Sequence, residues 1–134
     1  MCLIIDAIYH PDFKPLIAKE DIICYKILFT YRDSNNNKKY ITPYMMTSVL
    51  HGTLIADRFQ INVSSYFKRV DFGIHSFQNR SVALLERDLL NTSLPKYPIA
   101  NKYIVKKAII PKGAEYWIGK NDEYCSERIV FAEK

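Results

Sequence analysis

The sequence has few cysteines, no linker rich in proline, glycine or serine, and no long apolar run. A membrane-spanning helix requires about 20 consecutive apolar residues, and no stretch approaches that length. Cys2, Cys24 and Cys125 form an odd, widely spaced set, which provides neither a disulfide framework nor a Cys-x-x-Cys metal knuckle. The three histidines also lack the spacing of zinc ligands. We therefore expect no membrane span, no structural metal and no cofactor.

The size and composition of the chain predict one domain covering residues 1–134. Its 134 residues are 49% hydrophobic and 13% aromatic, which argues against intrinsic disorder. A chain of this length buries about two-thirds of its unfolded surface, so it folds without a metal or disulfide. The first ten residues contain Asp6 and no basic segment, unlike a secretory signal. These features predict a compact, soluble, cytoplasmic domain.

The positive charge is spread along the chain. The 19 basic and 14 acidic residues give a net charge of +5, but the basic residues cluster only as Lys38–Lys39, Lys68–Arg69 and Lys106–Lys107. Proteins that bind phosphate backbones concentrate lysine and arginine on one face. The charge therefore predicts a solvated surface rather than a nucleic-acid interface.

Most of the regular pattern is typical of β-strands, because short apolar runs rich in β-branched and aromatic residues alternate with turn signals. Strands are predicted at residues 2–8, 21–32, 40–42, 54–62, 66–72, 102–110, 114–118 and 128–132, and residues 73–77 form a short apolar segment that ends at a turn. Pro111-Lys112-Gly113 is expected to close a hairpin between the strands on either side of it.

One helix is predicted, over residues 81–90. Its apolar stripe consists of Val82, Leu85 and Leu89, widened by Ala83, Leu84 and Leu90. Asn79 or Ser81 is placed to cap its start. Together, the predicted strands and helix indicate an α+β domain, in which a mostly antiparallel, curved sheet packs against one principal helix.

Two segments resemble a known arrangement. Residues 73–86 (GIHSFQNRSVALLE) and 105–119 (VKKAIIPKGAEYWIG) are similar to a strand–helix unit and a strand–turn–strand unit at the C-terminal end of some bacterial and phage-borne pentapeptide-repeat proteins. The resemblance covers about a third of the chain and implies membership of a small family found in phages and other mobile elements. It implies an origin and a fold, but no established activity. The pentapeptide array itself is absent, which suggests that the domain functions alone.

A second resemblance is to the ADP-ribosyltransferase-like folds. His51-Gly52-Thr53, followed by Gly73-Ile74 and a helix, looks like the spacing of their nicotinamide-ribose site. An imidazole and a hydroxyl two residues apart on a strand face the same side and can hold a ribose together. The sequence departs from this pattern because His75 replaces the expected tyrosine. It also offers only Glu115 and Glu127 as late catalytic candidates.

His75 and Cys2 each allow two interpretations. His75 precedes the predicted helix, where backbone N–H groups can hold an anion, but it is equally a histidine packed on the core that bonds a backbone carbonyl. Removal of Met1 would make Cys2 an N-terminal nucleophile with its own α-amine as the base. The following Leu3-Ile4-Ile5 favours instead a buried edge strand.

The ten tyrosines are explained either as a stacking surface for a ligand or partner, or simply as strand residues. Tyr44, beside Pro43 and two methionines, is the best candidate for an exposed contact.

The first functional hypothesis is therefore a non-enzymatic binding protein of a phage or mobile element. It would act in the bacterial cytoplasm by occupying a host protein or sequestering a small ligand, such as a nucleotide, to counter a host defence. His51, Thr53, His75 and Tyr44 are its candidate ligand contacts. The alternative is an ADP-ribosyltransferase-like or N-terminal-cysteine enzyme acting on a nucleotide, NAD-type or amide substrate, with Cys2 as the catalytic candidate.

Overall fold

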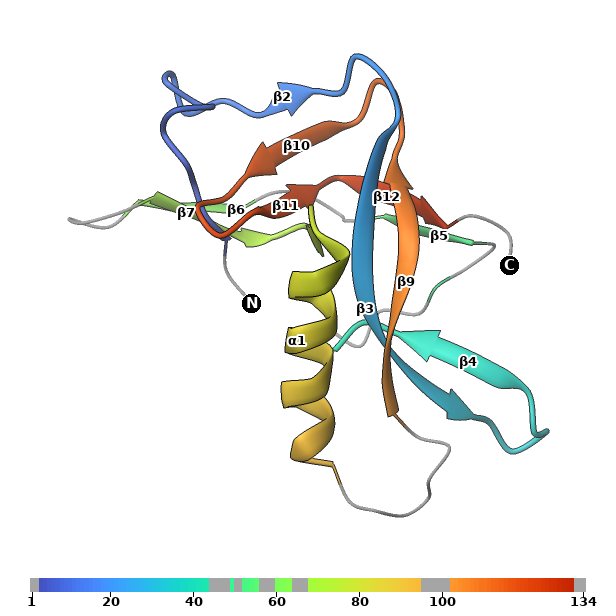
Figure 1. Cartoon of the computed structure of the whole chain (residues 1–134). Helices are drawn as coiled ribbons and strands as arrows, with labels where there is room; N and C mark the ends of the chain where they lie inside the picture. The colour runs from blue at the N-terminus through green and yellow to red at the C-terminus, as the bar shows by residue number, and fades with distance from the viewer. Residues whose placement is uncertain are drawn as a thin grey trace.

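The computed structural model describes residues 3–43, 49, 52–55, 60–63, 68–94 and 102–131. Within these ranges the chain forms twelve strands and one helix (Figure 1). In chain order they are β1 (Leu3–Ile4), β2 (Leu16–Ile17), β3 (Ile22–Arg32), β4 (Lys38–Ile41), β5 (Thr53–Ile55), β6 (Gln60–Val63), β7 (Lys68–Phe72), β8 (Ile74–Phe77), α1 (Arg80–Thr92), β9 (Lys102–Ile110), β10 (Glu115–Ile118), β11 (Glu123–Ser126) and β12 (Arg128–Phe131).

The strands form two antiparallel sheets, so the predicted α+β class is confirmed. The larger sheet is open and has the order β2-β10-β11-β8-β3-β9-β12-β5, with β4 paired to β3, and the smaller has the order β1-β7-β6. The long strands β3 and β9 pair from Ile22–Ile110 to Thr30–Lys102 and run lengthwise through the molecule beside α1 (Figure 1). No helix in the described ranges is long and apolar enough to span a membrane.

Alternate residues of β3 face two different cores. Cys24, Lys26 and Leu28 are buried on one face, whereas Tyr25 and Ile27 pack toward α1 on the other. This alternation follows from the period of two in a strand. A lysine therefore shares a buried face with a cysteine and a leucine.

The predicted helix forms, but its apolar stripe does not face the sheet as a whole. Ala83 is buried against β3, β8 and β9, with Val82 and Leu90 beside it. Leu85 and Leu89 are 67% and 64% exposed. The small Ala83 side chain lets the helix backbone approach the sheet. With Ala83 facing the sheet, Leu85 and Leu89 lie on the outer face of the helix. Asn79 takes the N-cap position with extended backbone angles, but its side chain makes no capping hydrogen bond.

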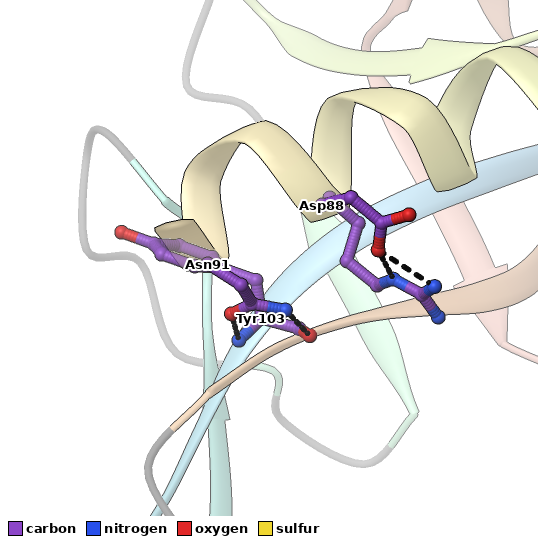
Figure 2. A network of polar contacts seen from close by, with 4 residues as sticks. Asp88, Asn91 and Tyr103 are labelled. Atoms are coloured by element: carbon purple, nitrogen blue, oxygen red, sulfur yellow. Dashed lines mark hydrogen bonds and ion pairs between the residues drawn. The ribbon is translucent and has the colours of Figure 1, made fainter. Parts of the chain in front are cut away.

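The C-terminal turn of α1 is fastened to the start of β9. The Asn91 side chain accepts a hydrogen bond from the Tyr103 backbone N–H at 2.8 Å and donates one to the Tyr103 carbonyl at 3.1 Å (Figure 2). The nearby Arg87–Asp88 ion pair, at 2.9 Å, joins two neighbours on the exposed side of the helix. The asparagine bonds, rather than the ion pair, fix the helix against the sheet, because exposed ion pairs contribute little to stability.

The predicted strand over residues 2–8 is wrong in its length. β1 has only two residues, and Asp6 then turns the chain by accepting a hydrogen bond from the Ile8 N–H at 3.1 Å. Ile8 is 84% exposed. An aspartate that bonds to the backbone two residues later favours a turn over a strand.

His10 connects this N-terminal segment to β10. Its buried ring donates from Nδ1 to the Lys14 carbonyl at 2.9 Å and accepts at Nε2 from the Ile118 N–H at 2.8 Å. The partners assign the proton to Nδ1, because a carbonyl can only accept and an N–H can only donate. The ring centroid also lies 4.9 Å from that of the buried Trp117. His10 is therefore a structural residue with both nitrogens satisfied.

The hairpin predicted around Pro111-Lys112-Gly113 is also wrong, although the turn is present. β9 pairs with β3 and β12, whereas β10 pairs with β2 and β11. The turn bonds to the chain preceding β3, because the Gly113 N–H donates to the Ala18 carbonyl at 2.8 Å and the Lys112 N–H to Asp21 Oδ1 at 2.9 Å. The turn thus redirects the chain between separate parts of the sheet. The partner strand β11 was not predicted.

Replacing Gly113 with valine should lower the free energy of unfolding by about 1–3 kcal/mol, measured by urea denaturation. Gly113 has a φ of +90°, and an added Cβ would meet no atom within 4 Å, so the cost comes from backbone strain. Lys112→Ala is the matched control, since Lys112 bonds through its backbone, and should change stability by less than about 0.5 kcal/mol. Equal stability of Gly113→Val and the unmodified protein would contradict this account of the turn.

Three apolar clusters meet around β8 and β11. Ile74 belongs to the cluster centred on Leu28 and Ile129, Phe77 to the cluster beneath α1, and Cys125 to the cluster around Trp117. Polar side chains are buried at this junction, among them Lys26, Ser76 and Ser126. Because burial of polar groups is costly, their concentration here makes this junction the candidate functional site.

Candidate functional site

A pocket opens at this junction, between β3, β8, β11, α1 and Pro43, the second residue after β4. The space between these elements is about 370 Å³, most of which is open to solvent at the mouth. Its lining residues are Lys26, Ile27, Pro43, His75, Ser76, Phe77, Glu86, Leu90 and Glu123. The wall thus combines an apolar surface with one amine, one imidazole and two carboxyl groups.

Lys26 is the most unusual residue of the pocket. Its side chain is 7% exposed, and its Nζ donates one hydrogen bond to the His75 carbonyl oxygen at 2.7 Å. Burial lowers the pKa of Lys26 to about 8. In the part of the chain that the structure describes, no carboxylate forms an ion pair with this amine. Buried lysines normally have such a partner.

Two carboxyl groups line the same pocket from different elements. Glu123 comes from β11 and Glu86 from α1. Burial raises the pKa of Glu123, and the charge of Glu86 raises it further. A carboxyl group in this state holds a proton more readily than an exposed glutamate, and can donate or accept it near a ligand.

A thiol and an imidazole also meet in this region. His75 and Cys125 are directly opposite in the β8–β11 pairing, with 3.8 Å between His75 Nε2 and Cys125 Sγ. Burial raises the pKa of Cys125 to about 12 and that of Cys24 to about 11. Both thiols are completely buried and remain protonated, so neither is a nucleophile at neutral pH. Cys24 packs in the same apolar cluster as Leu28.

The structure places one predicted site residue in the pocket and one elsewhere. His75 is half-buried in the pocket wall. Thr53 lies on β5, opposite Val130, and three strands separate β5 from β8 in the sheet order. At about 4.8 Å per strand, Thr53 is roughly 19 Å from His75 along the sheet. The two residues therefore do not form one site.

The remaining candidates divide into two groups. Cys2, Tyr44 and His51 lie outside the described residues, so their roles stay predictions. Glu115 lies opposite Ile17 in the β2–β10 pairing, and Glu127 forms an ion pair with Arg128. Neither glutamate lines the pocket.

Sequence reasoning missed Lys26, Glu86 and Glu123. The sequence pattern indicated that Lys26 is buried. Lys26 lies two residues from both Cys24 and Leu28 in an apolar strand, so the three side chains point to the same face of the sheet. Glu86 lies three residues after Ala83 and four before Leu90, which places it on the inner helix face. Glu123 had no comparable signal, because its position depends on the unpredicted strand β11.

Among the described residues, no three histidine, cysteine, aspartate or glutamate side chains group closely enough to hold a metal ion. The chemistry of the pocket rests on Lys26, with Glu86 and Glu123 in the same wall. Comparison of the chain with protein-family models, curated proteins and solved structures finds no match.

Proposed function

We propose that the protein binds and sequesters a small organic ligand in the pocket formed by β3, β8, β11 and α1. The observation that carries this proposal is Lys26, a buried lysine among the residues that line an open pocket, which forms no ion pair with a carboxylate in the described ranges. A ligand oxygen with negative charge, or a carbonyl oxygen, would supply a partner of the kind that a buried ammonium group normally has.

The rest of the wall defines the ligand further. Ile27, Phe77 and Leu90 provide an apolar surface that removes water from the bound molecule. Glu86 and Glu123 accept hydrogen bonds from hydroxyl or amino groups on the ligand. A small molecule with an oxyanion or carbonyl at one end and hydroxyl groups at the other fits this pattern, and a nucleoside monophosphate is one such molecule.

The biological setting belongs to the same proposal. The resemblance of residues 73–86 and 105–119 to phage-borne proteins supports a role in a phage or mobile element, in the cytoplasm of a bacterial host. Sequestering a host signal molecule would counter a defence that depends on it. The enzymatic alternatives rest on His51 and Cys2, which the described ranges do not include.

Thermal unfolding in the presence of candidate ligands tests the proposal. Nucleoside monophosphates, small carboxylates and small aldehydes are added to the protein, to Lys26→Met and to Lys107→Met. Lys107 is an exposed lysine on β9, so its variant is a matched control for loss of positive charge. A ligand present at a concentration of one hundred times its Kd raises the free energy of unfolding by about 2.7 kcal/mol and raises Tm by several degrees.

We expect this rise in the unmodified protein and in Lys107→Met, but not in Lys26→Met. If no compound raises Tm while a host protein is recovered by pull-down, the protein acts by occupying that partner instead. A ligand-induced rise that is equal in all three proteins would place the binding site elsewhere.

A further inference from the structure

We propose that the protein binds single-stranded nucleic acid on one face of the three-strand ribbon formed by β4, β3 and β9. This inference is independent of the ligand pocket, because the side chains that carry it do not line that pocket. It assigns a second binding surface to the protein, together with the chemical class of the partner.

The positive charge that is spread along the sequence is gathered by the fold into these three strands. Seven of the 19 lysine and arginine residues lie in them, and none of the 14 aspartate and glutamate residues does. The remaining 12 basic and 14 acidic residues give the rest of the chain a net charge of −2. The net positive charge of the protein therefore comes from one ribbon, whose basic residues belong to three separate segments of the sequence.

Strand pairing places four of these basic residues on one face of the ribbon. Arg32 lies opposite Lys38 in the β3–β4 pairing. Lys102 of β9 lies opposite Thr30, which is two residues before Arg32 on β3. Lys106 lies four residues after Lys102, so the period of two in a strand turns both side chains to the same side. The surface that these residues form is called the basic face, and it consists of Arg32, Lys38, Lys102 and Lys106.

Two ammonium groups of the basic face converge on one aromatic ring. Lys106 Nζ lies 4.4 Å from the centroid of the Tyr40 ring, and Lys38 Nζ lies 5.7 Å from it. Both distances are within the range of about 6 Å for a cation–π interaction. Because two like charges drawn to one ring repel each other, an anion bound between them stabilises the arrangement.

No acidic side chain neutralises the basic face. In the residues that the structure describes, none of its four cations forms an ion pair. Arg32 donates to the Asn36 carbonyl at 3.0 Å, and Asp33 accepts hydrogen bonds from the Asn35 and Asn37 N–H groups. These bonds form the β3–β4 turn, and the hairpin extends away from the rest of the sheet (Figure 1). The basic face is therefore accessible to a large partner.

The dimensions of the basic face fit a chain of anions better than a single one. From the position of Lys106 to that of Arg32, it extends over six residues of β3, or about 20 Å. A nucleic acid presents a row of phosphates over such a length. Proteins that bind single strands combine a basic surface with aromatic side chains on which bases stack. Tyr40, which is partly exposed between the lysines, supplies such a side chain and favours a single strand over a duplex, whose bases are already stacked.

Fluorescence anisotropy of labelled oligothymidylate and oligouridylate at several salt concentrations tests the proposal. Each phosphate contact to a single strand contributes about −0.7 to the slope of log Kobs against log salt, so four contacts give about −3. We therefore expect the affinity of the unmodified protein to fall roughly fiftyfold between about 50 and 200 mM salt. The ratio of the two affinities shows whether DNA or RNA is the preferred strand.

Charge variants locate the binding surface. The double variant Lys38→Gln/Lys106→Gln should lose about half of the salt slope, because two of four phosphate contacts are removed. Lys112→Gln/Lys120→Gln is the matched control, since it removes two exposed lysines outside the ribbon, and it should bind like the unmodified protein. Equal slopes in both double variants would place the binding surface elsewhere and overturn the proposal.

Tyr40 variants separate base stacking from charge. Tyr40→Leu should weaken binding at least fivefold with an unchanged salt slope, whereas Tyr40→Phe should bind like the unmodified protein. Thermal unfolding of each variant shows whether it is folded.

The unmodified protein alone can also overturn the proposal. If polyglutamate of equal charge competes as well as the oligonucleotide, the basic face binds acidic proteins instead. If a duplex binds as tightly as the single strands, the assignment to a single strand is wrong. If neither oligonucleotide binds at about 50 mM salt, the protein does not bind nucleic acid, and the proposed ligand pocket is unaffected.

Discussion

Replacing Lys26 with methionine is expected to stabilise the protein by about 2 kcal/mol at pH 7. Methionine has a similar length without a charge, so it removes the cost of holding an ammonium group in the interior. The lowering of the Lys26 pKa from 10.5 to about 8 corresponds to about 3 kcal/mol of this cost. The lost hydrogen bond to the His75 carbonyl returns about 1 kcal/mol.

The stability advantage of Lys26→Met over the unmodified protein should disappear as the pH rises. Between pH 8 and 10.5 the folded protein has released the Lys26 proton and the unfolded chain has not, so unfolding takes up a proton and higher pH favours the folded state. The free-energy cost of burying the Lys26 ammonium group is fully present below pH 8 and absent above pH 10.5. The unmodified protein should therefore become more stable relative to Lys26→Met across this interval.

Urea denaturation of both proteins at several pH values measures this difference. The buried thiols Cys24 and Cys125 also titrate in the alkaline range, but their raised pKa values reduce stability with pH in both proteins and largely cancel in the comparison. A Lys26→Met protein that is less stable than the original at pH 7 would show that Lys26 has an ionic partner. It would also weaken the case for a ligand-binding amine.

The His10→Ala substitution should lower the free energy of unfolding by about 4 kcal/mol. It leaves the Lys14 carbonyl and the Ile118 N–H without their bonds to the imidazole, at about 1–3 kcal/mol each, and it removes a ring packed on Trp117. Since small domains are stable by only about 5–15 kcal/mol, a large fraction of the stability is lost.

Two measurements test the role of His10. Urea denaturation gives the loss of stability, and amide hydrogen exchange should show faster exchange at Ile118, whose N–H is bonded to His10 Nε2. Ile8→Ala is the control in the same segment, because Ile8 is 84% exposed, and it should change stability by less than about 0.5 kcal/mol. A loss of under 1 kcal/mol in His10→Ala, with unchanged exchange at Ile118, would contradict a structural role.

Elements with strong local patterns were predictable from the sequence. The apolar, β-branched run of β3 and the helical spacing of residues 81–90 each identify their element without reference to distant residues. The face that the helix buries was not predictable, because it depends on how closely Ala83 lets α1 approach the sheet. β11, with the short sequence EYCS, is recognisable only from its partners β8 and β10.

The residues of the candidate site were likewise predictable only where the local sequence pattern identifies them. His75 could be singled out because an imidazole between apolar residues is conspicuous in a short strand. Lys26 was also detectable from its phase in β3, although a single lysine in a strand is more commonly exposed. The meeting of Glu86 and Glu123 could not be predicted, since it requires α1 and β11 to approach across the sheet.

The pairing of β3 with β9 also determines when the protein can fold during its synthesis. Thr30 and Lys102 are 72 residues apart, and the His10–Ile118 bond joins residues 108 positions apart. At about 5–20 residues per second, a ribosome needs roughly 4–14 s to make the chain between Thr30 and Lys102. Such distant pairings also slow folding itself, because the intervening chain must be ordered first. Lys26 is therefore expected to remain an ordinary, solvated lysine on the nascent chain. Its side chain becomes buried only after β9 has been translated and can pair with β3.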